Sequence, residues 1–151
     1  MLNKIFVLIR IVLGLIFIVS GAEKAIGPSE NFLYVIQGYA ILPDALARLA
    51  SWVFPWIELF LGVFILLGLW LDWAFKGLLL VSGSLILMVG QAIVRKLPLD
   101  SCGCFGNLVH LPLRGVILLD CSIFLLTLVS LKNLDRARFL SLDALYSKNR
   151  S

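Results

Sequence analysis

The chain consists of four long apolar stretches separated by connections that are richer in polar residues. The stretches cover residues 5–21, 52–71, 74–94 and 115–131, and each contains 17 to 21 residues. An α-helix of this length crosses a hydrocarbon core of about 30 Å. The alternation of polarity that membrane strands require is missing, so helices must satisfy the backbone hydrogen bonds. The pattern predicts an all-α membrane protein whose core is a bundle of four transmembrane helices.

Composition agrees with a membrane location. Of the 151 residues, 61% are apolar and 15% are charged, whereas soluble domains are roughly half apolar and a quarter charged. We expect one transmembrane domain over residues 1–131, followed by a cytoplasmic tail over residues 132–151. The net charge of +4 does not favour nucleic acid, whose binding needs a basic face on a polar scaffold. The expected partner of the apolar surface is the lipid bilayer.

The first connection, residues 22–51, contains two further helical signals. Residues 31–38 mix apolar and polar side chains, which is typical of a short interfacial helix on the membrane surface. Pro43 and Asp44 mark a new helix start that runs into the second span, where Pro55 predicts a kink. In the tail, a weak amphipathic pattern at 139–146 predicts a surface helix.

Lysine and arginine are divided unequally between the two sides of the predicted bundle. Seven belong to the N-terminus, the second connection and the tail, and five to the first and third connections. The positive-inside rule then puts both termini in the cytoplasm and the third connection outside, in a bacterial cytoplasmic (inner) membrane. A cleaved signal peptide is the alternative for the N-terminus, because Lys4 precedes an apolar run. Arg10 interrupts that run and argues against cleavage.

One face of the first predicted helix has small, charged and aromatic residues at steps of four and three: Arg10, Gly14, Phe17, Gly21 and Lys24. Small residues let membrane helices approach closely, so we expect this face to pack against other helices. Gly83 and Gly90 predict the same role in the third span. Arg10 is expected to pair with Asp120 of the fourth helix.

The third connection contains the sequence CGCFG at residues 102–106. Cys102 and Cys104 can reach disulfide distance, and Gly103 gives the backbone freedom to close the ring. A strained disulfide is more easily reduced than a structural one, which favours a redox-active pair on the outer side. A structural disulfide would gain little chain entropy from so small a loop. A zinc site with His110 would depart from the usual cysteine spacing, and no metal is expected.

Cys121 lies about seven residues into the fourth predicted helix. A lone cysteine in an apolar helix is most often a small packing residue. It joins the redox pair only if the CGCFG loop folds down onto this helix.

Charges inside membrane spans cost about 2.5–3.5 kcal/mol each, so each one needs a reason. The predicted topology gathers a set of polar residues at the outer end of the bundle: Glu23, Lys24, Glu58, Gln91, Arg95 and Arg114. The cations among them, Lys24, Arg95 and Arg114, would favour a thiolate on the cysteine pair. Glu58 is expected to accept a proton or to form an ion pair with Lys24 or Arg95.

Four stretches resemble the methylamine-utilisation protein family MauE, within the wider DoxX-like membrane proteins. They read RIVLGLIFIVSGAEK (10–24), GYAILP (38–43), PWIELFLGVFILLG (55–68) and CGCFG (102–106). The resemblance implies a four-helix membrane protein linked to the maturation of a disulfide-rich dehydrogenase subunit outside the cytoplasm, together with a thioredoxin-like partner. The arrangement is also similar to quinone-coupled bundles related to vitamin K epoxide reductase, although this chain has no Cys-x-x-Cys pair.

The leading hypothesis is a membrane thiol–disulfide redox protein in which Cys102 and Cys104 are catalytic and Glu58 assists. The pair would exchange with a thioredoxin-like exported partner or a secreted disulfide-containing protein. No tightly bound cofactor is expected, and a membrane quinone is the candidate electron acceptor. The alternatives are a non-catalytic membrane assembly partner and a small-molecule carrier that uses Glu58 and Arg95.

Overall fold

The computed structural model describes residues 2–96 and 113–137, which form six α-helices. The CGCFG segment and the tail helix expected at 139–146 lie outside the described residues. The helices are α1 (Leu2–Ile26), α2 (Ser29–Gly38), α3 (Asp44–Leu67), α4 (Leu71–Val94), α5 (Leu113–Lys132) and α6 (Leu134–Ala137).

Four of these helices, α1, α3, α4 and α5, are long and apolar enough to cross a membrane. The predicted all-α fold with four spans is therefore confirmed. The short helix expected at 31–38 is also present, as α2. Helix α3 begins at Asp44 after Pro43, as predicted, and includes Pro55 in its interior. It ends at Leu67, earlier than the apolar stretch does, because Gly68 takes the left-handed backbone conformation with φ 72°.

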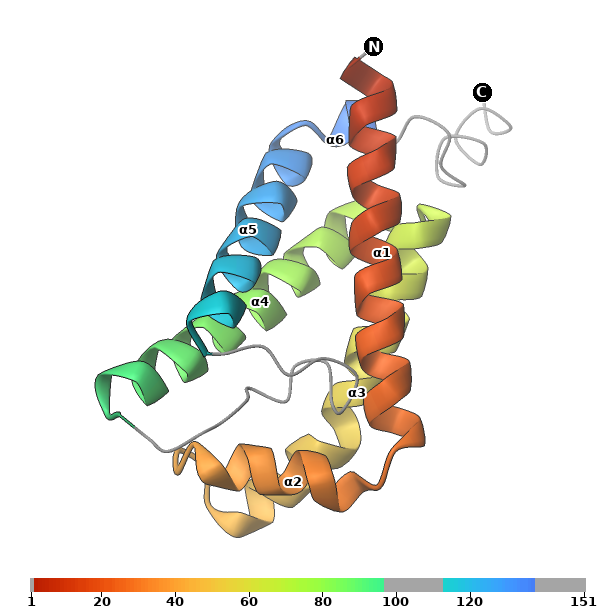
Figure 1. Cartoon of the computed structure of the whole chain (residues 1–151). Coiled ribbons are helices and arrows are strands. Elements are labelled where there is room, and N and C mark those ends of the chain that lie inside the picture. The colour runs from red at the N-terminus through yellow and green to blue at the C-terminus, as the bar shows by residue number, and fades with distance from the viewer. Residues whose placement is uncertain (1, 97–112, 138–151) are drawn as a thin grey trace.

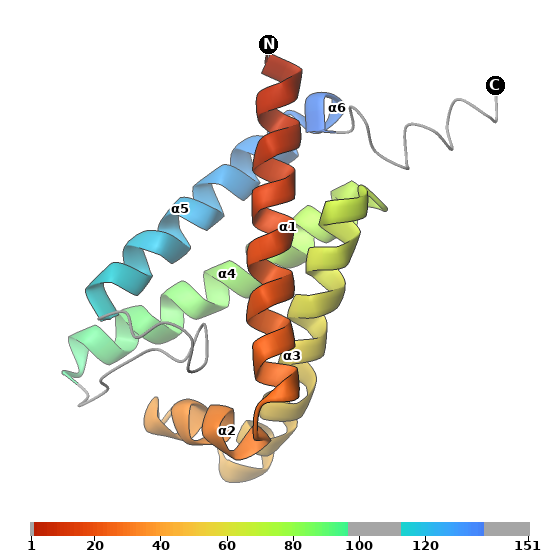
Figure 2. The same ribbon diagram turned by 45° about the vertical axis from the view of Figure 1, so that its right-hand side comes forward.

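The four long helices form two pairs (Figures 1 and 2). Helices α1 and α3 run antiparallel in close contact, whereas α4 and α5 pack on each other and lean away from the first pair. Helix α2 lies across the end of the bundle where α1 finishes, here named the α2 end. Helix α6 lies at the opposite end, beside the start of α1.

Glycine sets the distance between α1 and α3. A Cβ added to Gly14 would lie 3.0 Å from the Gly62 carbonyl oxygen, and one added to Gly62 would lie 2.8 Å from the Ile18 backbone nitrogen. The side chains of Arg10, Phe17 and Lys24 on the same face of α1 are buried. The predicted packing face of the first helix is therefore confirmed.

The glycines of α4 behave differently from those of α1. A Cβ on Gly83 would make only an ordinary contact, 3.6 Å from the Phe124 ring, and one on Gly90 would meet nothing within 4 Å. The prediction that both glycines permit close helix approach is wrong. A seven-residue step places residues on one face of a helix, but it does not say whether another backbone covers that face.

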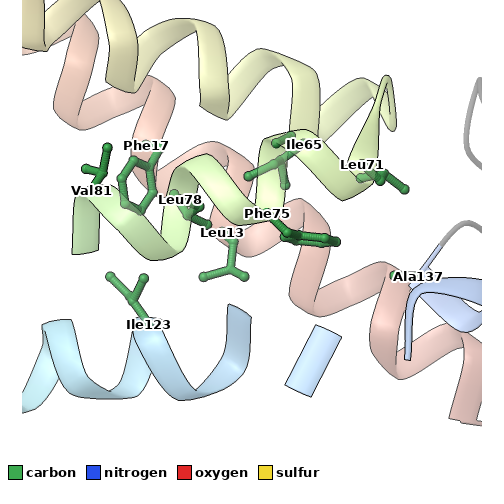
Figure 3. Packing of buried hydrophobic residues seen from close by; sticks show 10 residues of the cluster. Leu13, Phe17, Ile65, Leu71, Phe75, Leu78, Val81, Ile123 and Ala137 are labelled. Atoms are coloured by element: carbon green, nitrogen blue, oxygen red, sulfur yellow. The ribbon is translucent and has the colours of Figure 1, made fainter. Parts of the chain in front are cut away.

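The apolar core joins all four spanning helices (Figure 3). Leu13 and Phe17 of α1 face Phe75 and Leu78 of α4, and Ile123 closes the cluster from α5. Phe75 and Leu78 are fully buried. This cluster packs the α4–α5 pair against the α1–α3 pair.

The outside of the bundle is apolar, as contact with lipid requires. Leu80 and Leu87 of α4 and Leu118 of α5 are each more than two-thirds exposed. Large exposed tryptophans occur near the α3–α4 turn, at Trp70 and Trp73, and also along α3, at Trp52 and Trp56. Tryptophan is enriched where a membrane protein meets the two bilayer interfaces, so this distribution suits a multi-pass membrane protein.

Candidate functional site

A buried ion pair joins α1 and α3 near the α2 end. Lys24 Nζ lies 2.7 Å from Glu58 Oε2 and 2.9 Å from Glu58 Oε1, so the ammonium faces both carboxylate oxygens. Each side chain is only 1% exposed. Two opposite charges this deeply buried are stable only when each has close partners. Of the two partners expected for Glu58, Lys24 is the one that the structure provides.

Ser20 completes the polar group. It lies one helical turn before Lys24 on the same face of α1, and its Oγ accepts a hydrogen bond of 3.0 Å from Lys24 Nζ. Ser20 Oγ also donates to Glu58 Oε2 at 3.1 Å. The hydroxyl therefore bridges the two charges. Its four-residue spacing from Lys24 was a readable signal that sequence analysis did not use.

Two aromatic rings lie against the ammonium of Lys24. Lys24 Nζ lies 5.1 Å from the ring centre of Phe32 in α2 and 5.9 Å from that of Phe54 in α3. The ring centres are 6.2 Å apart. Cation–π attraction of this kind stabilises a desolvated ammonium. Phe32 and Phe54 were not among the predicted site residues, because their positions look like ordinary apolar packing in the sequence.

An apolar cavity of about 230 Å³ lies beneath α2, here named the α2 cavity. Lys24 is the charged residue in its wall, and Ser84 and Tyr39 add hydroxyl groups. Its apolar lining includes Phe32, Val35, Ile36, Phe54, Leu85 and Met88. Since these residues come from α2, α3 and α4, the cavity fills the gap between the two helix pairs on the α2 side.

A second hollow, of about 300 Å³, also reaches Lys24 and lies between α1 and α3. Gly27, Ser51, Trp52 and Pro55 line it, and it is named here the Gly27 hollow. Lys24 thus stands between an apolar cavity and a more polar hollow.

Tyr39 closes the α2 cavity at the end of α2. It is buried and packs with Val89, Ala92 and Val116 of α4 and α5. Burial raises the pKa of Tyr39 to about 12, and the negative charge of Asp120 adds to the effect. The phenol therefore stays neutral over the physiological range and stands near a carboxylate of α5.

Among the remaining predicted site residues that the structure describes, none is seen to bond to the Lys24–Glu58 pair. Arg95 is exposed at the end of α4, where its guanidinium lies against the Gln91 side chain and joins no ion pair within the described part of the chain. Glu23 is half-buried beside Lys24. Cys121 has a free thiol, half-buried on α5. Arg114 begins α5, but its side chain, like Cys102 and Cys104, lies outside what the structure describes.

Asp120 does not pair with Arg10, contrary to the expectation. Arg10 Nη1 donates to the Ala137 carbonyl oxygen at 3.0 Å, at the far end of the bundle from α2. Asp120 instead lines a small cavity with Ser20 and Glu58. Arg10 and Ser20 are about 15 Å apart along α1, so the two charges lie at different depths. Within residues 2–96 and 113–137, no three metal-ligating side chains cluster.

Comparison with known families gives a match over most of the chain. The sequence model of the family described as "Methylamine utilisation protein MauE" matches residues 2–132. Searches of curated proteins and of solved structures found nothing that matches the chain. The matched range includes all four spanning helices, the ion pair and the cysteine pair.

Proposed function

We propose a function from the premise that this chain belongs to the MauE family, whose described role is methylamine utilisation. In the proposal, this multi-pass membrane protein carries out thiol–disulfide chemistry at the outer face of a bacterial inner membrane. Its disulfide supports the maturation of an exported protein. Cys102 and Cys104 form the redox pair, and the buried Lys24–Glu58 group lies at the same end of the bundle.

The arrangement of the helix ends supports this location for the pair. Helix α4 finishes at the α2 end, where Val89 and Ala92 pack against Tyr39. Helix α5 also begins toward that end (Figure 1). The connection that contains both cysteines therefore leaves from, and returns to, the end at which Lys24 and Glu58 are buried. The excess of lysine and arginine at the opposite end favours a cytoplasmic location for the termini.

The proposed reaction is a two-electron thiol–disulfide exchange. A thiolate of an exported dithiol protein attacks the Cys102–Cys104 disulfide and forms a mixed disulfide, which the second thiol of that protein resolves. The exported protein gains a disulfide, and this chain is left with two thiols. To restore the disulfide, the dithiol would pass two electrons and two protons to a membrane quinone, which would leave as the quinol. A thioredoxin-like exported protein is the partner whose dithiol chemistry fits this exchange.

The α2 cavity is the proposed site for the quinone ring. Its aromatic and aliphatic lining suits a flat apolar ring, and small-molecule sites are usually apolar with a few polar groups. The Lys24 ammonium in the wall would stabilise the negative charge that develops on a quinone oxygen during reduction. Helix α2 provides Phe32, Val35 and Ile36 and so forms the cover of the cavity. The geometric support for the proposal is this buried ammonium beside an apolar cavity.

The test measures disulfide transfer by the whole protein in lipid nanodiscs. Reduced thioredoxin-fold protein and a soluble quinone analogue are supplied, and disulfide formation is followed by thiol alkylation. We expect the wild type to oxidise the dithiol and Cys102→Ser/Cys104→Ser to lose the activity. Cys121→Ser is the matched control and should retain it. Equal rates in the wild type and the double variant would contradict the proposal.

A further inference from the structure

A third cavity lies deeper in the bundle, between α1, α3 and α5. Its volume is about 20 Å³, and its polar lining consists of Ser20, Glu58 and Asp120. A cavity needs a volume of roughly 10–15 Å³ and two to four polar partners to hold one water molecule. This cavity, named here the Asp120 cavity, meets both conditions.

Asp120 is the unusual member of this group. The residue is 4% exposed, and its Oδ2 has no hydrogen-bond partner in the described part of the chain. Buried polar atoms in proteins are nearly always partnered, so an unpartnered carboxylate oxygen beside a water-sized cavity points to an occupant. The occupant must supply a hydrogen-bond donor or a positive charge.

The charges around the cavity identify that occupant. Lys24 faces the group from α1, Glu58 from α3 and Tyr39 from the connection between α2 and α3, whereas α4 adds only Leu85 to the lining. Lys24 is already committed to both oxygens of Glu58. With all carboxylates ionised, the three charges of Lys24, Glu58 and Asp120 sum to −1. An uncompensated charge inside a span is costly, so one more positive charge is needed.

We propose that Lys24, Glu58 and Asp120 together hold one exchangeable proton, which rests on Asp120 at neutral pH and is hydrogen-bonded to a water molecule in the Asp120 cavity. The lining has five side-chain oxygens, but the Ser20 hydroxyl and both Glu58 oxygens already accept hydrogen bonds from Lys24. The two remaining oxygens, those of Asp120, are too few to replace the hydration shell of a metal cation, which favours the proton. For exchange, the Asp120 O–H bond breaks and the proton passes through the water to a Glu58 oxygen. No electrons move. The proposal does not depend on the cysteine chemistry.

The test uses infrared spectroscopy of the purified protein in nanodiscs at neutral pH. The carbonyl stretch of a protonated carboxylic acid is separate from that of a carboxylate, and it shifts when H₂O is replaced by D₂O. We expect the wild type to have this band and Asp120→Asn to lose it. Asp72→Asn, which alters an exposed aspartate paired with Lys76, is the matched control and should keep the band.

A second variant tests the shared charge. In Glu58→Gln, Lys24 loses its carboxylate partner, so Asp120 becomes the nearest counter-charge and should release its proton. The band should then weaken at least several-fold. A band that is absent from the wild type, unchanged in Asp120→Asn or unchanged in Glu58→Gln would overturn the proposal. Loss of the wild-type band when sodium chloride replaces choline chloride would overturn it in favour of a metal cation.

Discussion

Gly21 of α1 lies directly against the backbone of Pro55 in α3. A Cβ on Gly21 would stand 2.8 Å from the Pro55 carbonyl oxygen and 2.7 Å from the Leu59 nitrogen. The contact falls within one helical turn of Lys24 on α1 and of Glu58 on α3. It therefore sets the distance across which the two charges meet.

The first prediction concerns this contact. Gly21→Ala should destabilise the protein by about 1–3 kcal/mol, because backbone atoms on α3 cannot move aside as a flexible side chain would. Thermal unfolding in detergent measures the effect. Gly90→Ala is the control: open space surrounds Gly90, so the change should be neutral or slightly stabilising. Equal losses in the two variants would contradict the close packing of α1 on α3.

The second prediction concerns the Lys24–Glu58 ion pair. Lys24→Met or Glu58→Gln alone should cost about 3–5 kcal/mol, because each change leaves a buried charge without its partner. The double variant should lose clearly less than the sum of the two. The exposed Lys76–Asp72 pair of α4 serves for comparison, and breaking it should cost only about 0.2–0.5 kcal/mol. Additive losses at Lys24 and Glu58 would mean that the two do not interact.

A third prediction tests the α2 cavity as a quinone site. Ala50 lines the cavity from α3, so Ala50→Trp should fill it and weaken the binding of a soluble quinone analogue by at least tenfold. Ala45→Trp, on an exposed part of the same helix, is the matched control and should leave binding unchanged. Quenching of tryptophan fluorescence by the quinone measures both. Undiminished binding to Ala50→Trp would place any quinone elsewhere.

The fourth prediction is a titration of Tyr39. Its pKa of about 12 lies above the ordinary value of 10.0, so the folded protein binds this proton more tightly than the unfolded chain does. The stability contributed by neutral Tyr39 is complete below pH 10 and is lost as the pH rises through about 12. Absorbance of ionised tyrosine should contain a step near this pH that Tyr39→Phe lacks. An identical curve for the variant would contradict the burial of the phenol.

The fifth prediction concerns topology. In a variant without native cysteines, Ser29→Cys at the start of α2 should react with an impermeant maleimide in intact cells. Asn3→Cys near the N-terminus should react only after the membrane is permeabilised. Both positions are exposed in the fold, so access to each thiol depends on its side of the membrane. The reverse labelling pattern would overturn the outer location of the α2 end.

Much of the fold could be predicted from the sequence, because lipid imposes simple rules. Apolar length fixed the number of spans, and Pro43 with Asp44 fixed the start of α3. The spacing of Arg10, Gly14 and Gly21 identified the packing face of α1. Each of these signals is local, since it depends on the chemistry of one helix.

The partners across helices were harder to predict. Nothing in the spacing along any one helix shows that Glu58 meets Lys24 rather than Arg95, or that Phe32 from α2 folds over the ammonium. The expected pairing of Asp120 with Arg10 is wrong because the direction in which α5 leans depends on the packing of all the helices. The sequence of one helix does not contain this information. Periodicity gives the face of a helix, whereas the depth at which two faces meet depends on all the helices together.

The long separation of partners along the chain has a consequence for biogenesis. The partner of Lys24 in α1 is Glu58, 34 residues later in the chain, and the partner of Arg10 is the Ala137 carbonyl, 127 residues later. When α1 leaves the ribosome, its polar face has none of these partners, and lipid is a poor substitute for them. The polar contacts of α1 therefore form only after α3 has been synthesised, and the contact of Arg10 forms only after α6 has been synthesised.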